Sequence, residues 1–422
     1  MKEEKKLVPK LRFSEFRDVG EWQFTPLNQL ATRGKQKNRD EKIERVLTNS
    51  AEFGVLDQRD YFDKDIATQG KLEGYFVVEL GAYVYNPRIS ATAPVGPISK
   101  NNIATGVMSP LYTVFKFKDR NNDFYAHYFK TAGWHSYMRQ ASSTGARHDR
   151  MAISSSDFMA MPLPMASPEE QQKIADCLSS LDELIAALAR KVDALKTHKK
   201  GLMQQLFPRE GETQPRLRFP EFRDTGEWVI EKLETLAKRG SGHTPSKSSS
   251  EYYDGGIKWV SLADSKQLDA GLISTSKIEI SKQGIKNSSA VLHPAGTVLI
   301  SRDAGVGKSA VMGIPMAVSQ HFIVWTCNPS LLSNWFLYHL LQKMKPVFER
   351  NATGSTIKTI GLPFFKALCV SVPSLPEQQR IADCLNSLDD LITAATQELE
   401  TLKTHKKGLM QQLFPSVEAV EA

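Results

Sequence analysis

Two stretches of the 422-residue chain carry the same long pattern of apolar positions. In each, apolar side chains recur at alternating spacings of four and three residues, and a single lysine interrupts the run. The positions are Ile174, Leu178, Leu181, Ile185, Leu188, Val192, Leu195, Lys199, Leu202 and Leu206, then Ile381, Leu385, Leu388, Ile392, Ala395, Leu399, Leu402, Lys406, Leu409 and Leu413. Such a sustained 3.5-residue period is typical of coiled-coil helices. We expect the two helices to pair with each other; the alternative is that each packs on its own domain.

Both helices have clear start and stop signals. Ser167-Pro168-Glu169 and Leu375-Pro376-Glu377 place a proline early and an acid in the first turn, and Pro208 and Pro415 end the helices. A helix of about 40 residues is about 60 Å long. Because the second helix must return along the first, the simplest path is an antiparallel pair with one domain at each end.

The chain is an internal duplication whose matching strings start 206 to 208 residues apart. The matching strings are LRFSEFRDVGEW and LRFPEFRDTGEW, from Leu11 and Leu217; PEEQQKIADCLSSLDELI and PEQQRIADCLNSLDDLI, from Pro168 and Pro376; and KTHKKGLMQQLFP, from Lys196 and Lys403. The middles of the two copies have diverged. A repeat this long predicts two domains rather than a solenoid.

Each middle region predicts a mixed α/β domain. Short β-rich runs such as GAYVYN, GTVLIS and CVSVP alternate with Gly/Ser/Asn loops and one or two aromatic helices. The predicted fold is therefore two tandem α/β domains separated by two long helices that form an antiparallel coiled coil with pseudo-two-fold symmetry. The predicted boundaries are 1–166 for the first domain, 167–208 for the first helix, 209–374 for the second domain, 375–415 for the second helix and 416–422 for a C-terminal tail.

Composition excludes several classes of protein. The net charge of +7 allows a nucleic-acid partner without requiring one. No apolar run approaches the roughly 20 residues of a membrane helix, and the start MKEEKKLVPK lacks the apolar core of a secretory signal. Four cysteines (Cys177, Cys327, Cys369 and Cys384) are few for this length and predict free thiols in a reducing compartment.

No catalytic or metal-binding pattern is complete. Residues 305–309, GVGKS, follow an apolar strand, but Arg302 stands where a phosphate loop needs a glycine. We expect a tight turn with Lys308 and Ser309 free for an anionic partner. The sequence has no Cys-x-x-Cys, His-x-x-x-His, Gly-x-Ser-x-Gly or Asn/Asp-Pro-Pro-aromatic motif. We therefore predict no catalytic residues and no metal site, which disfavours an autonomous nuclease or methyltransferase.

Basic loops rich in Ser, Thr and Asn occupy similar slots in both copies. Arg and Lys bind phosphates or guanine edges, Asn reads adenine, and Ser and Thr fit either. The candidate DNA-binding residues are Tyr85, Asn86, Arg88, Lys100, Asn101, Ser143, Thr144, Arg147 and His148, then His243, Thr244, Ser246, Lys247, Arg302, Lys308, Ser355, Thr356 and Lys358. A tandem protein-interaction scaffold remains the alternative interpretation.

The whole chain resembles the specificity (S) subunit of type I restriction-modification systems. The resemblance rests on LRFPEFRDTGEW, the Gly-His-Thr-Pro-Ser-Lys segment at 242–247, STG or TGS before the last strands, and PEQQRIADCLNSLDDLI followed by a long helix, twice. It implies that each variable region is a target recognition domain reading one half of a bipartite double-stranded DNA target. It also implies that the two helices set the spacer and dock two modification subunits.

The resemblance implies a non-catalytic DNA-recognition subunit that binds no cofactor itself. S-adenosylmethionine would be bound by the modification subunits, which methylate adenine, and ATP with Mg²⁺ by the restriction subunits, which translocate and cleave DNA. The expected location is the cytoplasm of a bacterium or archaeon, at the nucleoid and away from any membrane.

Overall fold

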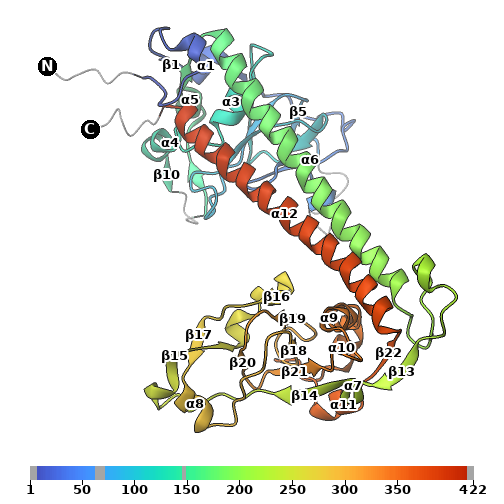
Figure 1. Ribbon diagram of the computed structural model, residues 1–422. Coiled ribbons are helices and arrows are strands. Elements are labelled where there is room, and N and C mark those ends of the chain that lie inside the picture. The colour runs from blue at the N-terminus through green and yellow to red at the C-terminus, as the bar shows by residue number, and fades with distance from the viewer. Residues whose placement is uncertain (1–6, 62–71, 145–148, 416–422) are drawn as a thin grey trace. The chain divides into compact units, whose positions relative to one another are not determined.

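The computed structural model describes residues 7–61, 72–144 and 149–415, and the chain divides into two compact units. Unit 1 comprises Met1–Leu188 with Glu398–Ala422, and unit 2 comprises Ala189–Gln397 (Figure 1). Each long helix is shared between them. Helix α6 (Pro168–Leu206) begins in unit 1 and ends in unit 2, whereas α12 (Leu375–Leu413) begins in unit 2 and ends in unit 1.

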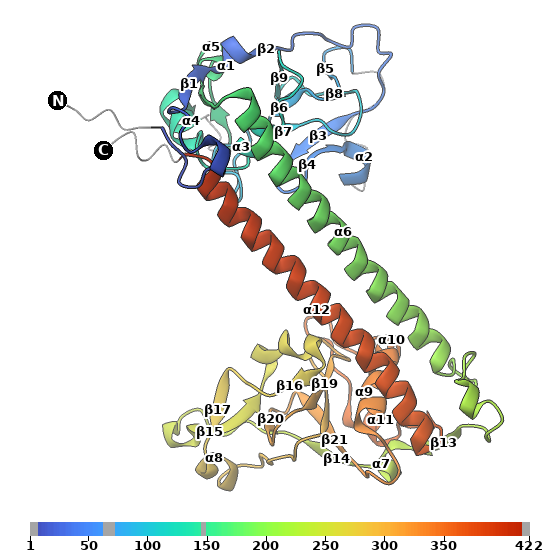
Figure 2. The same cartoon turned by 45° about the horizontal axis from the view of Figure 1, so that its top comes forward.

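Unit 1 is built on a four-stranded antiparallel sheet in the order β2-β9-β6-β7 (Figure 2). Its strands are β2 (Ala31–Arg33), β9 (Thr113–Phe117), β6 (Tyr83–Tyr85) and β7 (Ile98–Lys100). The two-stranded ribbons are β1 (Gln23–Pro26) with β12 (Pro162–Met165), β3 (Leu47–Ser50) with β4 (Gly54–Asp57), β5 (Phe76–Val78) with β8 (Gly106–Met108), and β10 (Ser143–Thr144) with β11 (Met151–Ala152). The short helices are α1 (Leu27–Leu30), α2 (Gln58–Tyr61), α3 (Asp123–Tyr128), α4 (His135–Ala141) and α5 (Ser155–Met159).

Unit 2 repeats this plan with an added strand. Its sheet order is β14-β21-β18-β19-β16, and the first four strands pair antiparallel as in unit 1 (Figure 1). The strands are β14 (Ala237–Ser241), β21 (Phe322–Cys327), β18 (Val298–Ser301), β19 (Ser309–Met312) and β16 (Leu272–Ile273); the smaller sheets hold β17 (Ile278–Ile280), β15 (Tyr253–Val260) and β20 (Ala317–Val318), and β13 (Val229–Lys232) with β22 (Cys369–Val372). The helices are α7 (Leu233–Leu236), α8 (Lys282–Lys286), α9 (Asn334–Lys343), α10 (Lys345–Asn351) and α11 (Leu362–Lys366). The predicted mixed α/β class is confirmed.

A buried carboxylate holds the start of α6 to unit 1. Glu170, in the first turn of the helix, has no exposed surface. Arg12 donates two hydrogen bonds to its two oxygens, both at 2.6 Å, and the Trp22 indole donates a third at 3.1 Å. Two bonds from one guanidinium to one carboxylate fix both the distance and the plane of the pair.

The same cluster holds the start of α12 in unit 2. Arg218 donates two hydrogen bonds of 2.7 Å to Glu377, and Trp228 donates one of 3.3 Å. Glu377 is only 1% exposed. The arginine, tryptophan and glutamate come from the LRF, GEW and PEE/PEQ strings, so the buried ion pair accounts for the close match of these strings between the repeats.

The lysines that interrupt the apolar seam are ion-paired across it. In unit 2, Lys199 of α6 contacts both carboxylate oxygens of Asp389 on α12 at 2.5 Å. In unit 1, Lys406 of α12 pairs with Asp182 of α6. Both lysines are repeat mates, as are both aspartates, so each unit makes the same pair with the helices exchanged. Burial lowers the pKa of Lys406, and the contact with Asp182 opposes that shift.

The two helix segments run antiparallel within each unit. In unit 1, Ile174 near the start of α6 and Leu413 at the end of α12 share one core, and in unit 2 Leu206 and Ile381 do so. The expectation that the helices pair with each other is therefore confirmed inside each unit. The remaining seam positions are buried or half-buried, namely Leu181, Ile185, Leu188, Val192, Leu195, Leu388, Ile392, Leu399 and Leu402.

A buried histidine also ties each domain to its long helix. His127 Nε2 lies 3.1 Å from Ser179 Oγ, and His339 Nε2 lies 2.8 Å from Asn386 Oδ1, at matching positions of the two repeats. Burial lowers the pKa of His127 to about 4 and that of His339 to about 3. Both rings are therefore neutral at pH 7.

We expect Glu170→Gln to lower the free energy of unfolding by about 3–5 kcal/mol, because it leaves the Arg12 charge buried without its partner. Glu169, exposed in the same helical turn, provides the matched control Glu169→Gln, which should change stability by less than about 0.5 kcal/mol. Urea unfolding followed by circular dichroism measures both. Equal losses in the two variants would contradict the role of the buried pair.

Candidate nucleic-acid interface

Two of the predicted loops of unit 2 meet beyond the end of β18. Residues 302–308 turn the chain from β18 into β19, and residues 353–359 form a closed loop beside them. The Ile360 amide donates to the Arg302 carbonyl at 3.0 Å, and Asp303 forms a β-bridge with Thr359. These backbone bonds fix the two loops against each other.

The turn before β21 connects a third predicted segment, residues 243–247, to these two loops. The Arg302 amide donates to the His321 carbonyl at 2.9 Å. At the end of β20, just before this turn, the Val318 carbonyl accepts from the His243 amide at 3.1 Å, and Thr244 hydrogen-bonds the side chain of Gln320 in the turn. Backbone hydrogen bonds therefore link the three segments of unit 2 that hold the predicted residues, 243–247, 302–308 and 353–359, through residues 318–321 and Arg302.

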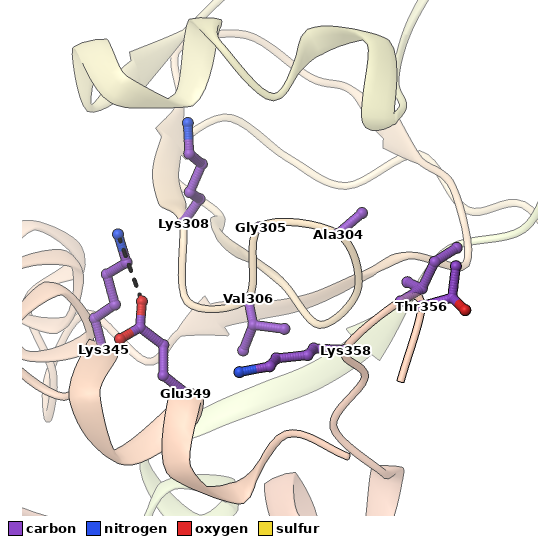
Figure 3. Close-up of a pocket in the computed structure, with 9 residues that line it drawn as sticks. Ala304, Gly305, Val306, Lys308, Lys345, Glu349, Thr356 and Lys358 are labelled. Carbon is purple, nitrogen blue, oxygen red and sulfur yellow. Dashed lines mark ion pairs between the residues drawn. The ribbon is translucent and has the colours of Figure 1, made fainter. Parts of the chain in front are cut away.

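A surface hollow, hollow 2, lies between these loops and α10 (Figure 3). It is lined by Ala304, Gly305, Val306, Lys308, Lys345, Glu349, Thr356, Ile357 and Lys358. The 302–308 turn needs left-handed backbone at Ala304 (φ 43°), Gly305 (φ 114°) and Gly307 (φ 85°), which is why glycines recur in it.

The lysines of hollow 2 differ in how far their charge is already neutralised. Lys308 turns away and places Nζ 2.8 Å from Asp269, and Lys345 lies 3.9 Å from Glu349 (Figure 3). Lys358 reaches toward Val306 and has no ion-pair partner within the described ranges. Lys358 is therefore the cation best placed to meet an incoming anion.

Unit 1 has a hollow, hollow 1, at the matching place beyond the end of β6. Arg88 forms a β-bridge with Arg150, and the Ile89 amide donates to the Asp149 carbonyl at 3.0 Å. Both arginines lie 3.9 Å from the Asp149 carboxylate. The lining mixes polar and apolar side chains, comprising Thr48, Asn49, Ser50, Ala51, Glu52, Asn86, Pro87, Arg88, Ile89, Ser90, Thr92, Pro97, Leu111, Tyr112 and Arg150.

Two candidates of the first repeat are structural rather than surface residues, which corrects the sequence-based expectation. Tyr85 is 1% exposed, its hydroxyl donates to the Val95 carbonyl at 2.9 Å, and burial raises its pKa. Asn101 is fully buried and its amide donates to three backbone carbonyls around a turn.

Other candidates of the first repeat divide by position. Asn86 and Arg88 line hollow 1, whereas Lys100 pairs with Asp123 at 2.7 Å. Lys100 lies opposite Tyr83 in the β6–β7 register, at the far end of the sheet from the hollow. Ser143 and Thr144 form β10, which pairs with the strand after Arg150. Arg147 and His148 lie outside the described residues.

In the second repeat, Lys308, Thr356 and Lys358 line hollow 2 and Ser355 is exposed beside them. Ser309 is not free for a ligand, contrary to expectation, because it is fully buried and its hydroxyl accepts from Gln342 at 2.9 Å. The other members of the second set are exposed or half-exposed, namely His243, Thr244, Ser246, Lys247 and Arg302.

Sequence reasoning missed the cationic residues that long-range folding brings to the hollows. Lys345 lies on α10, far along the chain from the 302–308 turn, and no local signal marked it. Arg150 was missed although it directly follows a candidate loop.

In the described ranges, no group of three His, Cys, Asp or Glu residues could hold a metal ion. None of the helices there combines the length and apolarity that crossing a membrane needs.

Comparison with known proteins shows what this chain is similar to. Residues 225–404 match the family model of the type I restriction modification DNA specificity domain. The chain is 25% identical over 269 residues to the putative type I restriction enzyme MjaX specificity subunit of Methanocaldococcus jannaschii, covering 63% of this chain and 61% of that relative. It is 25% identical over 325 residues to the MjaVIII specificity subunit of the same organism, covering 73% of each.

A solved structure shares the fold. The type I restriction-modification S subunit from M. genitalium superposes with a TM-score of 0.58 at 14% identity, covering 97% of this chain and 100% of that one. The chain spans about three fifths of the length of the first curated relative, MjaX, in the matched region. Residues 225–404 thus match the type I restriction modification DNA specificity domain, the chain as a whole is similar to type I restriction enzyme specificity subunits, and it shares the fold of a solved S subunit.

Proposed function

We propose that this chain is the non-catalytic DNA-recognition subunit of a type I restriction-modification complex. Each unit reads one half of a bipartite double-stranded target through its hollow and the loops around it. The observation that carries the proposal is the recurrence of a hollow with basic side chains at the matching place of two otherwise diverged domains. A protein-interaction scaffold would not need two such cationic sites beside exposed hydrogen-bonding side chains.

The proposal assigns the chemistry to partner subunits. Two modification subunits carry S-adenosylmethionine, and restriction subunits carry ATP and Mg²⁺, while this chain supplies sequence choice in the bacterial or archaeal cytoplasm. The test is methylome sequencing of cells with and without this gene. A bipartite methylated motif that depends on the gene supports the proposal, and an unchanged methylome contradicts it.

Lys358→Gln should weaken binding to duplex DNA and reduce the slope of log affinity against log salt by about one, because one phosphate contact is lost. Lys308→Gln is the matched control, since Asp269 already neutralises that lysine, and its slope should change less. Titration of labelled duplex at several salt concentrations measures both. An unchanged slope for Lys358→Gln would remove this residue from the interface.

The long helices are proposed to set the spacer between the half-sites, since both α6 and α12 contribute to both units. Removing one heptad from each helix, 186–192 and 395–401, keeps the register of the Lys199–Asp389 and Lys406–Asp182 pairs. It shortens the pair by about 10 Å, or about three base pairs at 3.4 Å each. Methylation mapping should then show unchanged half-sites with a shorter spacer. Altered half-site bases at the old spacing would contradict the ruler.

The identical helix ends are proposed to help dock the modification subunits. Gly201 and Gly408 stand at matching positions in the helix interiors, where glycine costs about 1 kcal/mol relative to alanine. A β-carbon added at either would meet no atom of the described residues within 4 Å beyond its own helix backbone. The fold itself therefore gives no reason for glycine, whereas close approach of a partner would.

The double variant Gly201→Ala/Gly408→Ala should unfold at a higher denaturant concentration, because alanine favours the helix, yet form a weaker complex with the modification subunit. Thermal or urea unfolding and size-exclusion titration with that subunit separate the two effects. Gly226→Ala is the control, because Gly226 is equally open but lies outside the helices. A stabilised double variant that assembles normally would argue against docking at the glycines.

A further inference from the structure

Each hollow contains one strongly exposed aliphatic side chain among charged and polar neighbours. Ile357 is 57% exposed in hollow 2, and Leu111 is 55% exposed in hollow 1. A single exposed aliphatic residue is common on protein surfaces. Ile357 and Leu111 differ from such ordinary surface residues in two ways. Each lies on a turn that backbone hydrogen bonds hold in place, and each lies beside the basic side chains of its hollow.

The loop that presents Ile357 is closed and tight. Thr353 and Thr359 exchange backbone hydrogen bonds of 3.0 and 2.8 Å at its base. Gly354 has a φ of 119°, and a β-carbon there would lie 2.2 Å from the Ile357 carbonyl oxygen. Only glycine permits this turn, so the exposed position of Ile357 is imposed by the chain and is not the result of a loose loop.

Leu111 is held in a comparable way by different elements. The Tyr112 amide donates to the Ser109 carbonyl at 3.0 Å, and the Leu111 amide approaches Ser109 Oγ at 3.4 Å. The Tyr112 hydroxyl lies 3.2 Å from Thr48 Oγ1 on β3, in the lining of the same hollow. The turn is therefore anchored to the lining of hollow 1, while the Leu111 side chain in that lining stays exposed.

We infer that Ile357 and Leu111 each make an apolar contact with a base of the half-site that their unit reads. This inference rests on the proposed function and assigns part of the sequence choice to residues without hydrogen-bonding groups. Phosphates offer no apolar surface and the sugars are the same at every position, whereas bases offer flat faces and the thymine methyl group, which differ with sequence. Lys358, which follows Ile357 in the chain, supplies the phosphate contact. Lys358 therefore positions the protein on the DNA, and Ile357 contributes to the choice of base.

The test compares a duplex that carries the target found by methylome sequencing with an unrelated duplex of equal length. For the full chain, Ile357→Ser should lower affinity for the target about tenfold, leave affinity for the unrelated duplex unchanged, and leave the salt slope unchanged. Leu331→Ser, 45% exposed and outside the hollow, is the control for loss of an exposed aliphatic residue and should bind as the unsubstituted chain does. Circular dichroism verifies that each variant is folded.

Methylation mapping supplies the second readout. Ile357→Ser should relax the bases of one half-site only, and Leu111→Ser those of the other. Equal losses on both duplexes, or no loss, would overturn the inference while salt-dependent binding by the unsubstituted chain leaves the proposed function standing. If the unsubstituted chain shows no preference for the mapped target in the complex with its modification subunit, the proposed function itself fails.

Discussion

The buried carboxylate at the start of each long helix is the constraint on which the rest of the architecture depends. Glu170 and Glu377 are closed off from water, so each must be matched by a guanidinium held at hydrogen-bond distance. The partners come from a segment about 160 residues away, which brings the two ends of each repeat together. The sheet between them can then vary while the direction in which the helix leaves the domain stays the same.

The seam between the two long helices also uses one kind of ion pair twice, once in each unit. A lysine at a coiled-coil core position is costly unless it is paired, and pairing selects one register. Lys199 and Lys406 satisfy this requirement with aspartates that are each other's repeat mates. A slip of either helix would leave two ammonium groups and two carboxylates unmatched at once. The ion pairs thus specify alignment, while the leucines and isoleucines supply the burial.

Regular patterns were predictable from the sequence, and long-range placement was not. The 3.5-residue period and the repeated strings identified both helices and the duplication, because these signals are local and redundant. Tyr85 and Asn101 were misassigned because the same polar side chains that contact DNA also close turns inside a domain, where Asn101 satisfies three carbonyls. Lys345 could not be predicted from the sequence, because only the packing of α10 beside the 302–308 turn brings it to hollow 2.

The division of the units along the chain has a consequence for the order in which the protein forms. Unit 2 is one uninterrupted segment, 189–397, whereas unit 1 needs residues from both ends of the chain. Leu413 and Phe414 complete the core around Phe124 and Tyr128. During synthesis, unit 2 can therefore finish folding while unit 1 still exposes an open core. Unit 1 can complete its core only when α12 has emerged from the ribosome. A chain truncated before the end of α12 would therefore expose the apolar core of unit 1.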